Sequence, residues 1–265
     1  MHHEWRLLVG GNLPGARNMA RDWTLLEGVA AGSGPPTIRF YGWSPPCLSL
    51  GRHQGLEAVD LGFCAHEGID VVRRPTGGRA VLHHIELTYS VAAPLGRPPL
   101  PSGLQPAYRM LCQVLVDACR ELGVAAALTE GEVNVALPGP RTTVPCFKAP
   151  AAGEVVVAGR KLVGSAMRAH GGAMLQHGSI LLDWDGRLQA GAMGLANDRE
   201  LRPHVTTLAE QLGRAPDLQV LSVALVRAAE VRLALRLAPG SLSPRETERE
   251  DELLPEYDLT QTSLA

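Results

Sequence analysis

Apolar side chains recur at intervals of three and four residues along several stretches of the chain, a spacing that places them on one face of an α-helix. In the clearest stretch a Gly-Ser-Gly-Pro-Pro cluster directly follows the last apolar position and ends the pattern. The spacing predicts helices over residues 14–31, 56–67, 105–122 and 217–230. Near the end of the chain, Ser243, Pro244 and Glu246 supply an N-cap hydroxyl, a first-turn proline and a capping-box carboxylate. The acidic tail is therefore expected to open as a helix.

Short apolar runs and alternating apolar and polar residues indicate strands between these helices. They cover residues 37–43, 47–50, 69–72, 79–84, 86–91, 154–157, 161–163, 173–182 and 231–239, the last from the period-two pattern of Val231, Leu233 and Leu235. The strands 79–84 and 86–91 are expected to form one hairpin. The strands 154–157 and 161–163 are expected to form another, turning at Gly159.

This order of hairpins and helices predicts an α+β fold around a largely antiparallel or mixed sheet. No internal repeat and no linker interrupts the pattern, so residues 1–265 are interpreted as a single domain. A chain of 28.2 kDa is long enough to bury one large core.

Composition excludes several classes of protein. Hydrophobic residues make up 45% of the chain and charged residues 20%, which is typical of a soluble globular protein. No apolar run approaches the roughly 20 residues that span a bilayer, and the first residues lack a signal-peptide pattern. A cytoplasmic protein without a membrane segment is expected. The net charge of -2 gives no reason to expect a nucleic-acid partner.

Five cysteines are scattered along the chain without any Cys-x-x-Cys spacing: Cys47, Cys64, Cys112, Cys119 and Cys146. Their odd number and spacing disfavour a disulfide framework and a zinc site. Cys119 falls on the apolar face of a predicted helix, which favours a packing role. Cys146 lies between prolines in 143–150, where a loop can display a nucleophile beside Lys148. An inert loop cysteine is the alternative.

The most unusual stretch is 73–84, where three arginines and the Gly77-Gly78 pair interrupt a strand-like pattern. Glycines expose backbone amides and let a ligand approach closely, and arginines supply charge for a carboxylate or phosphate. A glycine bulge with solvated arginines is the alternative. Because no Gly-Lys-Ser/Thr follows, the stretch is not a Walker loop.

Two further clusters place polar residues within strand-like patterns, at 159–168 and 175–180. Lys161 is interpreted either as a surface lysine or as a buried cation that positions a carbonyl or carboxylate. His177 is interpreted either as a core histidine or as a site residue.

Together these stretches resemble the motifs of the lipoate–protein ligase and octanoyltransferase family, in the same order along nearly the whole chain. The matching segments are Asn18-Met19-Ala20 with Asp22, residues 38–43 with 48–51, residues 73–83 with 86–91, residues 159–166, and residues 175–180. Gly-Gly-Arg at Gly77 to Arg79 and Cys146-Phe147 resemble the cysteine-dependent octanoyltransferase branch more than the ATP-using ligases.

The resemblance implies the single-domain biotinyl/lipoyl-transferase fold and an acyltransferase of lipoate biosynthesis. An octanoyl group would arrive as a thioester on acyl carrier protein, pass to a cysteine, and leave on a lysine of a lipoyl domain, typically the glycine cleavage H protein. No metal and no bound cofactor is implied.

The resemblance also assigns roles to residues. Cys146 would be the nucleophile of a ping-pong reaction, and Lys161 would sit beside the acyl carbonyl, with backbone amides around Gly77-Gly78 and Gly164-Ser165 stabilising the oxyanion. Val81, Leu162, Val163 and Ala166 would line an apolar tunnel. The residues expected to bind substrate are Arg74, Thr76, Gly77, Gly78, Arg79, His83, Gly164, Ser165, Ala166, Arg168, His177 and Gly178.

Three positions depart from the family pattern. His84 stands where relatives commonly have Asp, which argues against an adenylate-forming reaction. Met167 replaces a frequent Gln, and 151–153 replaces a Ser-x-Tyr. The sequence leaves open an amidotransferase between lipoyl domains, an ATP-dependent lipoate ligase, and a non-catalytic lipoyl-domain-binding protein. Arg73, Arg74 and Arg79 form a local basic patch that could steer acidic protein partners.

Overall fold

An eight-stranded sheet runs through the computed structural model, which describes residues 3–131 and 153–259. Its strands are β1 (His3–Leu13), β2 (Thr37–Trp43), β6 (Glu86–Pro94), β7 (Ala127–Leu128), β8 (Val155–Val157), β9 (Arg160–His170), β10 (Ala173–Leu181) and β11 (Leu235–Pro239). They lie in the order β11-β1-β2-β6-β10-β9-β8-β7. Strand β1 is parallel to β11 and β2, and the other pairs are antiparallel, so the expected mixed sheet is confirmed.

A second sheet has three short strands, β3 (Cys47–Leu50), β4 (Asp70–Arg73) and β5 (Val81–His83), in the order β4-β3-β5. The helices are α1 (Gly15–Ala30), α2 (Leu61–His66), α3 (Leu104–Glu121), α4 (Gly186–Ala192), α5 (Leu208–Leu212), α6 (Leu218–Leu233) and α7 (Pro244–Tyr257). Two 3₁₀ turns, Leu56–Ala58 and Arg202–His204, complete the described elements.

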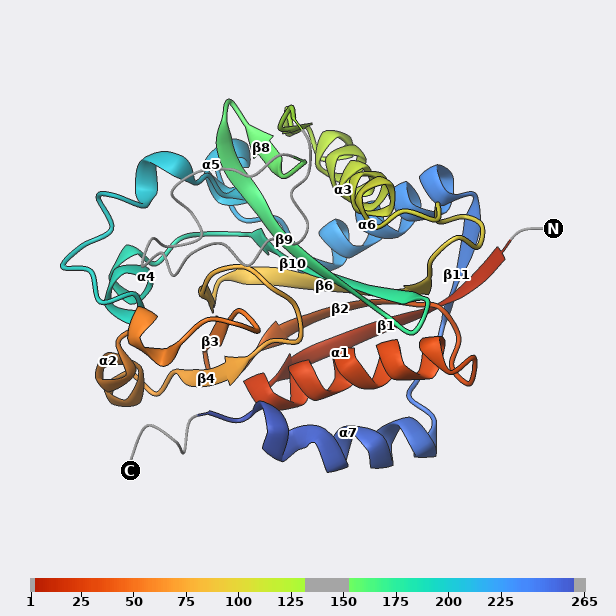
Figure 1. Ribbon diagram of the computed structural model, residues 1–265. Helices are drawn as coiled ribbons and strands as arrows, with labels where there is room; N and C mark the ends of the chain where they lie inside the picture. Colours follow the sequence, from red (N-terminus) through yellow and green to blue (C-terminus); the bar gives the residue numbers. More distant parts are fainter. Residues whose placement is uncertain (1–2, 132–152, 260–265) are drawn as a thin grey trace.

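The large sheet separates two layers, one formed by helices α3 and α6 and the other by α1, α7 and the small sheet (Figure 1). Helices α3 and α6 cover one face, where the largest apolar cluster joins them to inward side chains such as Phe40, Tyr89 and Val163. Helix α1 covers part of the other face, with α7 packed outside it, and the small sheet lies beside them. A cavity lies on this second face, between the two sheets.

Several predicted elements are confirmed at or near their expected bounds. Strands β2 and β3 match 37–43 and 47–50, and α1 and α3 match their apolar stripes within a residue at each end. The hairpin of β8 and β9 turns at Ala158-Gly159, where both residues have positive φ. Helix α7 begins with the expected capping box of Ser243 and Glu246.

The predicted hairpin of 79–84 with 86–91 is wrong. Strand β5 pairs with β3 in the small sheet, whereas β6 pairs with β2 and β10 in the large sheet. Alternation indicates which faces of a strand are buried, but it does not indicate the partner strand. The chain therefore crosses from one sheet to the other between His83 and Glu86.

Two other boundaries differ from the predictions. Val231 and Leu233 belong to α6, which ends in the left-handed Ala234, so the strand begins at Leu235 and not at Val231. Leu233 also lies four residues from the buried Ala229, a helical spacing that the period-two interpretation ignored. The helix expected over 56–67 is divided into a 3₁₀ turn and α2, because the Asp60 carboxylate caps α2 by accepting from the Phe63 amide at 2.8 Å.

Within the described residues, none of the helices combines the length and the apolar character that crossing a membrane requires.

Candidate active site

A cavity lies between the large sheet, the small sheet and α1. Its floor follows one row of paired residues across four strands, from Gly164 on β9 through Ser179 on β10 and Thr88 on β6 to Tyr41 on β2. The lining consists of Met19, Tyr41, Trp43, Ser49, Arg74, Gly78, Val81, His83, Thr88, Lys161, Gly164, Ser165, Ala166, His177, Gly178 and Ser179.

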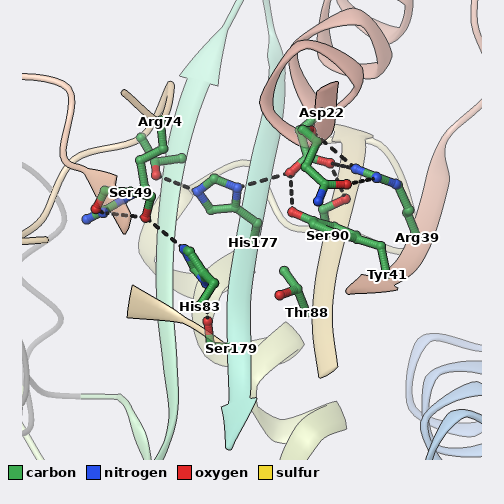
Figure 2. Close-up of polar contacts among 12 residues, drawn as sticks. Asp22, Arg39, Tyr41, Ser49, Arg74, His83, Thr88, Ser90, His177 and Ser179 are labelled. Atoms are coloured by element: carbon green, nitrogen blue, oxygen red, sulfur yellow. Dashed lines mark hydrogen bonds and ion pairs between the residues drawn. The ribbon is translucent and has the colours of Figure 1, made fainter. Parts of the chain in front are cut away.

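One wall is fixed by a buried network centred on the Asp22 carboxylate (Figure 2). Asp22 is fully buried and accepts from Arg39 Nη1 at 2.8 Å, Ser90 Oγ at 2.8 Å, Tyr41 Oη at 2.9 Å and His177 Nδ1 at 3.1 Å. Burial alone would raise the pKa of Asp22. The hydrogen bond from His177 and the charge of Arg39 outweigh burial and hold this pKa below the ordinary aspartate value.

This network determines the tautomer of His177. Burial lowers the pKa of His177, and the Asp22 carboxylate offsets that effect only in part, so the ring is neutral at pH 7. Because Asp22 can only accept, the proton is on Nδ1, and Nε2 must accept from the Thr76 hydroxyl at 2.6 Å. A chain of hydrogen bonds thus connects α1 to the 74–79 segment through β10.

His83 is held by a second carboxylate. Its Nδ1 donates to Glu86 Oε1 at 2.8 Å, and the same oxygen accepts from Thr88 at 2.5 Å and from Ser179 at 2.8 Å. The His83 Nε2 and Ser49 Oγ atoms lie 2.7 Å apart. Burial opposes ionisation of Glu86, yet the charge and hydrogen bond of His83 hold the pKa of Glu86 below its usual value.

Trp43 completes this side of the cavity. Its ring stacks on His83 with centroids 4.1 Å apart and planes 12° from parallel. Its indole Nε1 donates to the Thr88 hydroxyl at 2.7 Å. The polar atoms of these lining residues therefore bond to one another, and carbon atoms are left to face the cavity.

Lys161 enters the cavity at the β9 end. Its Nζ lies 2.7 Å from Glu154 Oε1, and both side chains are buried. A Cβ on Gly164 would stand 3.0 Å from Lys161 Cε and 3.3 Å from Nζ, so the glycine leaves room for the lysine. A buried ammonium beside an open cavity can donate to an oxygen that becomes negative during acyl transfer.

Arg74 shapes the 74–79 segment from within. Its guanidinium donates to the carbonyl oxygens of Ser49 at 2.9 Å, Gly77 at 2.7 Å and Arg79 at 2.7 Å, and only 5% of the residue is exposed. Gly78 has a φ of +96°, and a Cβ there would lie 2.7 Å from Arg74 Nη2. Glycine is therefore required at this position of the turn, which borders the cavity.

The structure brings most of the predicted site residues together. Nine of them line the cavity: Arg74, Gly78, His83, Lys161, Gly164, Ser165, Ala166, His177 and Gly178. Thr76 lies just behind, bonded to His177, and the carbonyls of Gly77 and Arg79 accept from Arg74. Arg168 donates to Pro75 O at 3.1 Å and places its guanidinium 4.4 Å from the Trp23 ring.

Some of the other predicted residues lie away from the cavity. Of the four expected tunnel residues, Val81 and Ala166 line the cavity, whereas Leu162 and Val163 pack in the main core under α3 and α6. In the basic patch, Arg73 and Arg74 use their guanidiniums on backbone carbonyls of this chain. Cys146, Lys148 and residues 151–152 lie outside the described residues.

Sequence reasoning assigned no role to four charged residues behind the site: Asp22, Arg39, Glu86 and Glu154. Each occurs within a helical stripe or strand-like run that is otherwise largely apolar, and this was an available signal, because a buried charge needs a partner. The partners lie far away in the chain, however, and only the fold identifies them.

The four described cysteines are buried and free. Burial raises the pKa of Cys64 to about 11 and the pKa values of Cys112 and Cys119 to about 12, and it raises that of Cys47 well above the usual thiol value. None of these four thiols is therefore suited to be a thiolate at pH 7. Among the described residues, no cluster of three His, Cys, Asp or Glu side chains could hold a metal ion.

The chain is similar to proteins of known family along most of its length. Residues 14–230 match the family described as the lipoyl protein ligase A/B catalytic domain. The chain is 42% identical to octanoyltransferase LipM of Symbiobacterium thermophilum, with 97% of this chain and 96% of that protein covered. It is 39% identical to octanoyltransferase LipM of Geobacillus kaustophilus, covering 94% and 93% of the two chains.

Two solved structures share the fold at low sequence identity. A lipoate-protein ligase A bound with ATP superposes with a TM-score of 0.78 and 22% identity, over 96% of this chain and 95% of that chain. A bipartite lipoate protein ligase from Thermoplasma acidophilum gives a TM-score of 0.76 and 22% identity, over 96% and 93%. The predicted fold class is thereby confirmed.

Proposed function

Because the chain belongs to the lipoyl protein ligase A/B catalytic domain family and is an octanoyltransferase of lipoate biosynthesis, we propose that it transfers octanoyl from octanoyl-acyl carrier protein to a lysine of a lipoyl domain, through a thioester on Cys146. The glycine cleavage H protein is the proposed acceptor. The proposal extends to a single catalytic domain over residues 1–265, acting in the cytoplasm.

One observation carries this proposal: carbon atoms form the walls of the cavity, and the buried Lys161 ammonium stands at one end of it. Polar lining residues such as Ser49, His83 and Thr88 direct their polar atoms to one another. A wall whose side-chain hydrogen bonds are already satisfied in this way favours an alkyl chain over a polar ligand. An octanoyl chain has this chemistry, and its carbonyl would lie at the Lys161 end.

Lys161 is proposed to stabilise the oxyanion. The Lys161 ammonium, which lies 2.7 Å from the Glu154 carboxylate, is proposed to act as a cationic donor toward the acyl oxygen. Backbone amides near Gly78 and Ser165, which also line the cavity, are proposed as further donors.

Cys146 is proposed as the nucleophile partly by exclusion. The other four cysteines are buried thiols with raised pKa values, so they are poor nucleophiles. Cys146 lies outside the described residues, and its role follows from the Cys146-Phe147 motif noted in the sequence.

The proposed reaction has two balanced halves. The Cys146 thiolate adds to the thioester carbon, the carrier thiolate leaves and takes up a proton, and an octanoyl-cysteine thioester remains. The neutral amine of the acceptor lysine then adds to that carbon, the carbon–sulfur bond breaks, and the amine proton replaces the one consumed. Both halves exchange one acyl bond for another, and ATP is not consumed.

Intact-protein mass spectrometry tests the proposal. Purified protein mixed with octanoyl-acyl carrier protein and no ATP should gain one octanoyl group that hydroxylamine removes. Cys146→Ala should gain none, whereas Cys119→Ala, which deletes a buried thiol in α3, should be acylated like the wild type. Labelling that persists in Cys146→Ala would refute the assigned nucleophile.

A chase separates the acyl donors and acceptors. The octanoyl group should move from the labelled protein to H protein. Acylation only by octanoylated H protein would instead identify an amidotransferase, and acylation of H protein only with free octanoate and ATP would identify a ligase.

A further inference from the structure

We propose that the open edge of β9, from Gly164 to Arg168, binds the phosphopantetheine arm of the acyl donor as an added strand, and that Arg52 and Arg168 bind its phosphate. The inference rests on the proposed function, because it takes the donor to be octanoyl-acyl carrier protein and places its thioester beside Lys161. It gives a binding role to a sheet edge and to Arg52.

Strand β9 is much longer than its neighbour β8 (Figure 1). Strand β8 pairs with β9 only from Arg160 to Val163, whereas β9 continues to His170 with β10 on its other side. Within the described residues, no strand covers this edge of β9 beyond Val163. Residues 164–166 and Arg168 are partly exposed there. An open edge presents N–H and C=O groups to which a further strand can bond.

The cavity reaches this edge. Gly164, Ser165 and Ala166 all line the cavity, although the side chains of consecutive strand residues point to opposite faces of a sheet. A cavity that touches three consecutive residues therefore touches the strand along its edge. Lys161 lines the same end of the cavity, so a thioester beside Lys161 has its sulfur at the start of the open edge.

The backbone groups that face the open edge belong to Ser165 and Met167. A Cβ on Gly178 would stand 2.5 Å from the Gly164 carbonyl oxygen, so Gly164 directs its carbonyl toward β10. Neighbouring residues of an antiparallel strand alternate in the edge to which they direct their N–H and C=O groups. Ser165 and Met167 therefore direct theirs away from β10. Pantetheine carries two secondary amides, which can bond to such an edge as a peptide strand does.

Two guanidinium groups lie where the arm would end. Arg168 donates to Pro75 O at 3.1 Å, and the Arg52 amide donates to the Thr76 carbonyl at 2.9 Å, so both residues flank the 74–79 segment. Burial and, after it, the charge of Arg52 lower the pKa of Arg168, because the two cations repel each other. Within the described residues, neither side chain has an ion-pair partner. A phosphate between them would offset this repulsion.

The length of the arm matches the length of the edge. Gly164 and Arg168 are separated by about 13 Å along the strand, at about 3.3 Å per residue. About 13 bonds join the sulfur of phosphopantetheine to its phosphorus, and at about 1.25 Å per bond the extended arm spans about 16 Å. The arginine side chains can reach over the difference of about 3 Å.

Small donors test the phosphate contact. Acyl-enzyme formation is followed by intact mass with octanoyl-phosphopantetheine and with octanoyl-pantetheine, which lacks the phosphate. In Arg52→Gln and in Arg168→Gln, the ratio of kcat/KM between these two donors should fall about tenfold, because a charge-assisted hydrogen bond is lost only with the first donor. Arg236→Gln is the matched control, because Arg236 is an exposed arginine on β11 at the far edge of the sheet. Its ratio should equal that of the wild type.

Hydrogen exchange tests the strand edge without relying on transfer. In Cys146→Ala, octanoyl-acyl carrier protein should slow exchange of the Ser165 and Met167 amides about tenfold. The exposed Gly10 and Gly11 amides of β1 should exchange as before. Apo-acyl carrier protein, which lacks the arm, should not slow exchange at either place.

An unchanged donor ratio in both arginine variants, or edge amides that the arm does not protect, would overturn the inference. If Arg168→Gln does not fold, Arg52→Gln decides, because Arg52 is exposed. Octanoyl transfer through Cys146 would stand in each of these cases. A wild-type protein that forms no acyl-enzyme from any octanoyl donor would instead refute the proposed function, and the inference with it.

Discussion

Asp22→Asn should destabilise the protein strongly although it changes only one functional group. Asp22 lies on α1 with no exposed surface and accepts four hydrogen bonds, two on each carboxylate oxygen. Asparagine keeps the shape but removes the charge. It also turns one of the two acceptor positions into a donor that faces other donors.

The magnitude follows from the burial of Arg39. This guanidinium is 1% exposed, and Asp22 is the carboxylate that pairs with it, at 2.8 Å. Removing one partner of a buried ion pair costs about 3–5 kcal/mol, because the remaining charge stays in the interior. For a chain of this size, 1 kcal/mol shifts Tm by about 2–4 °C, so Tm should fall by about 10 °C.

The assay is thermal unfolding followed by circular dichroism at pH 7. Asp117→Asn provides a matched control, because Asp117 pairs with Arg232 at a partly exposed position on α3. Exposed pairs contribute about 0–1 kcal/mol, so this control should unfold within about 2 °C of the wild type. The reasoning would be refuted if Asp22→Asn also unfolded within 2 °C of the wild type.

Two further predictions concern strand β10. Gly178→Ala should destabilise the folded protein by about 1–3 kcal/mol, which lowers its Tm. It should also slow acylation. Its Cβ would stand 2.5 Å from Gly164 O and 2.8 Å from Tyr89 Cε1, whereas Gly11→Ala, with open space around it, should have little effect. For His177, burial lowers the pKa in the folded state, so below pH about 6.5 the unfolded chain binds the proton first and stability falls as pH falls. The loss of Tm between pH 7.5 and pH 5 should therefore be smaller in His177→Gln; equal losses in the two proteins would contradict the buried neutral imidazole.

The three motif clusters that the sequence singled out do meet in space. Segment 73–84 supplies Arg74 and His83, 159–168 supplies Lys161 and Gly164, and 175–180 supplies His177. Judged by residue types alone, each cluster could also be interpreted as structural, as a glycine bulge, a surface lysine or a core histidine. The resemblance to the family rests on the order of these motifs along the chain. That resemblance predicted that the three clusters form one site.

Their geometry was not available from sequence. His177 is bonded to Asp22, 155 residues away, and Thr76 is 101 residues from His177. Of the buried ion pair at the cavity, sequence reasoning named Lys161 but not Glu154, which is only seven residues away across the β8–β9 hairpin. Spacing in sequence does not show which side chains of two strands share one cavity.

The sequence by itself determined the elements whose signals are local. The stripe of α1, the runs of β2 and β3, the Ala158-Gly159 turn and the capping box of α7 depend on backbone sterics and on the burial of one face, which a few neighbouring residues specify. Only the tertiary structure decided that β5 pairs with β3 and not with β6, and that Asp22 orients His177. Strand partners and buried charge pairs are selected by the free energy of the whole fold, because a buried polar group is stable only beside a partner that distant segments bring to it.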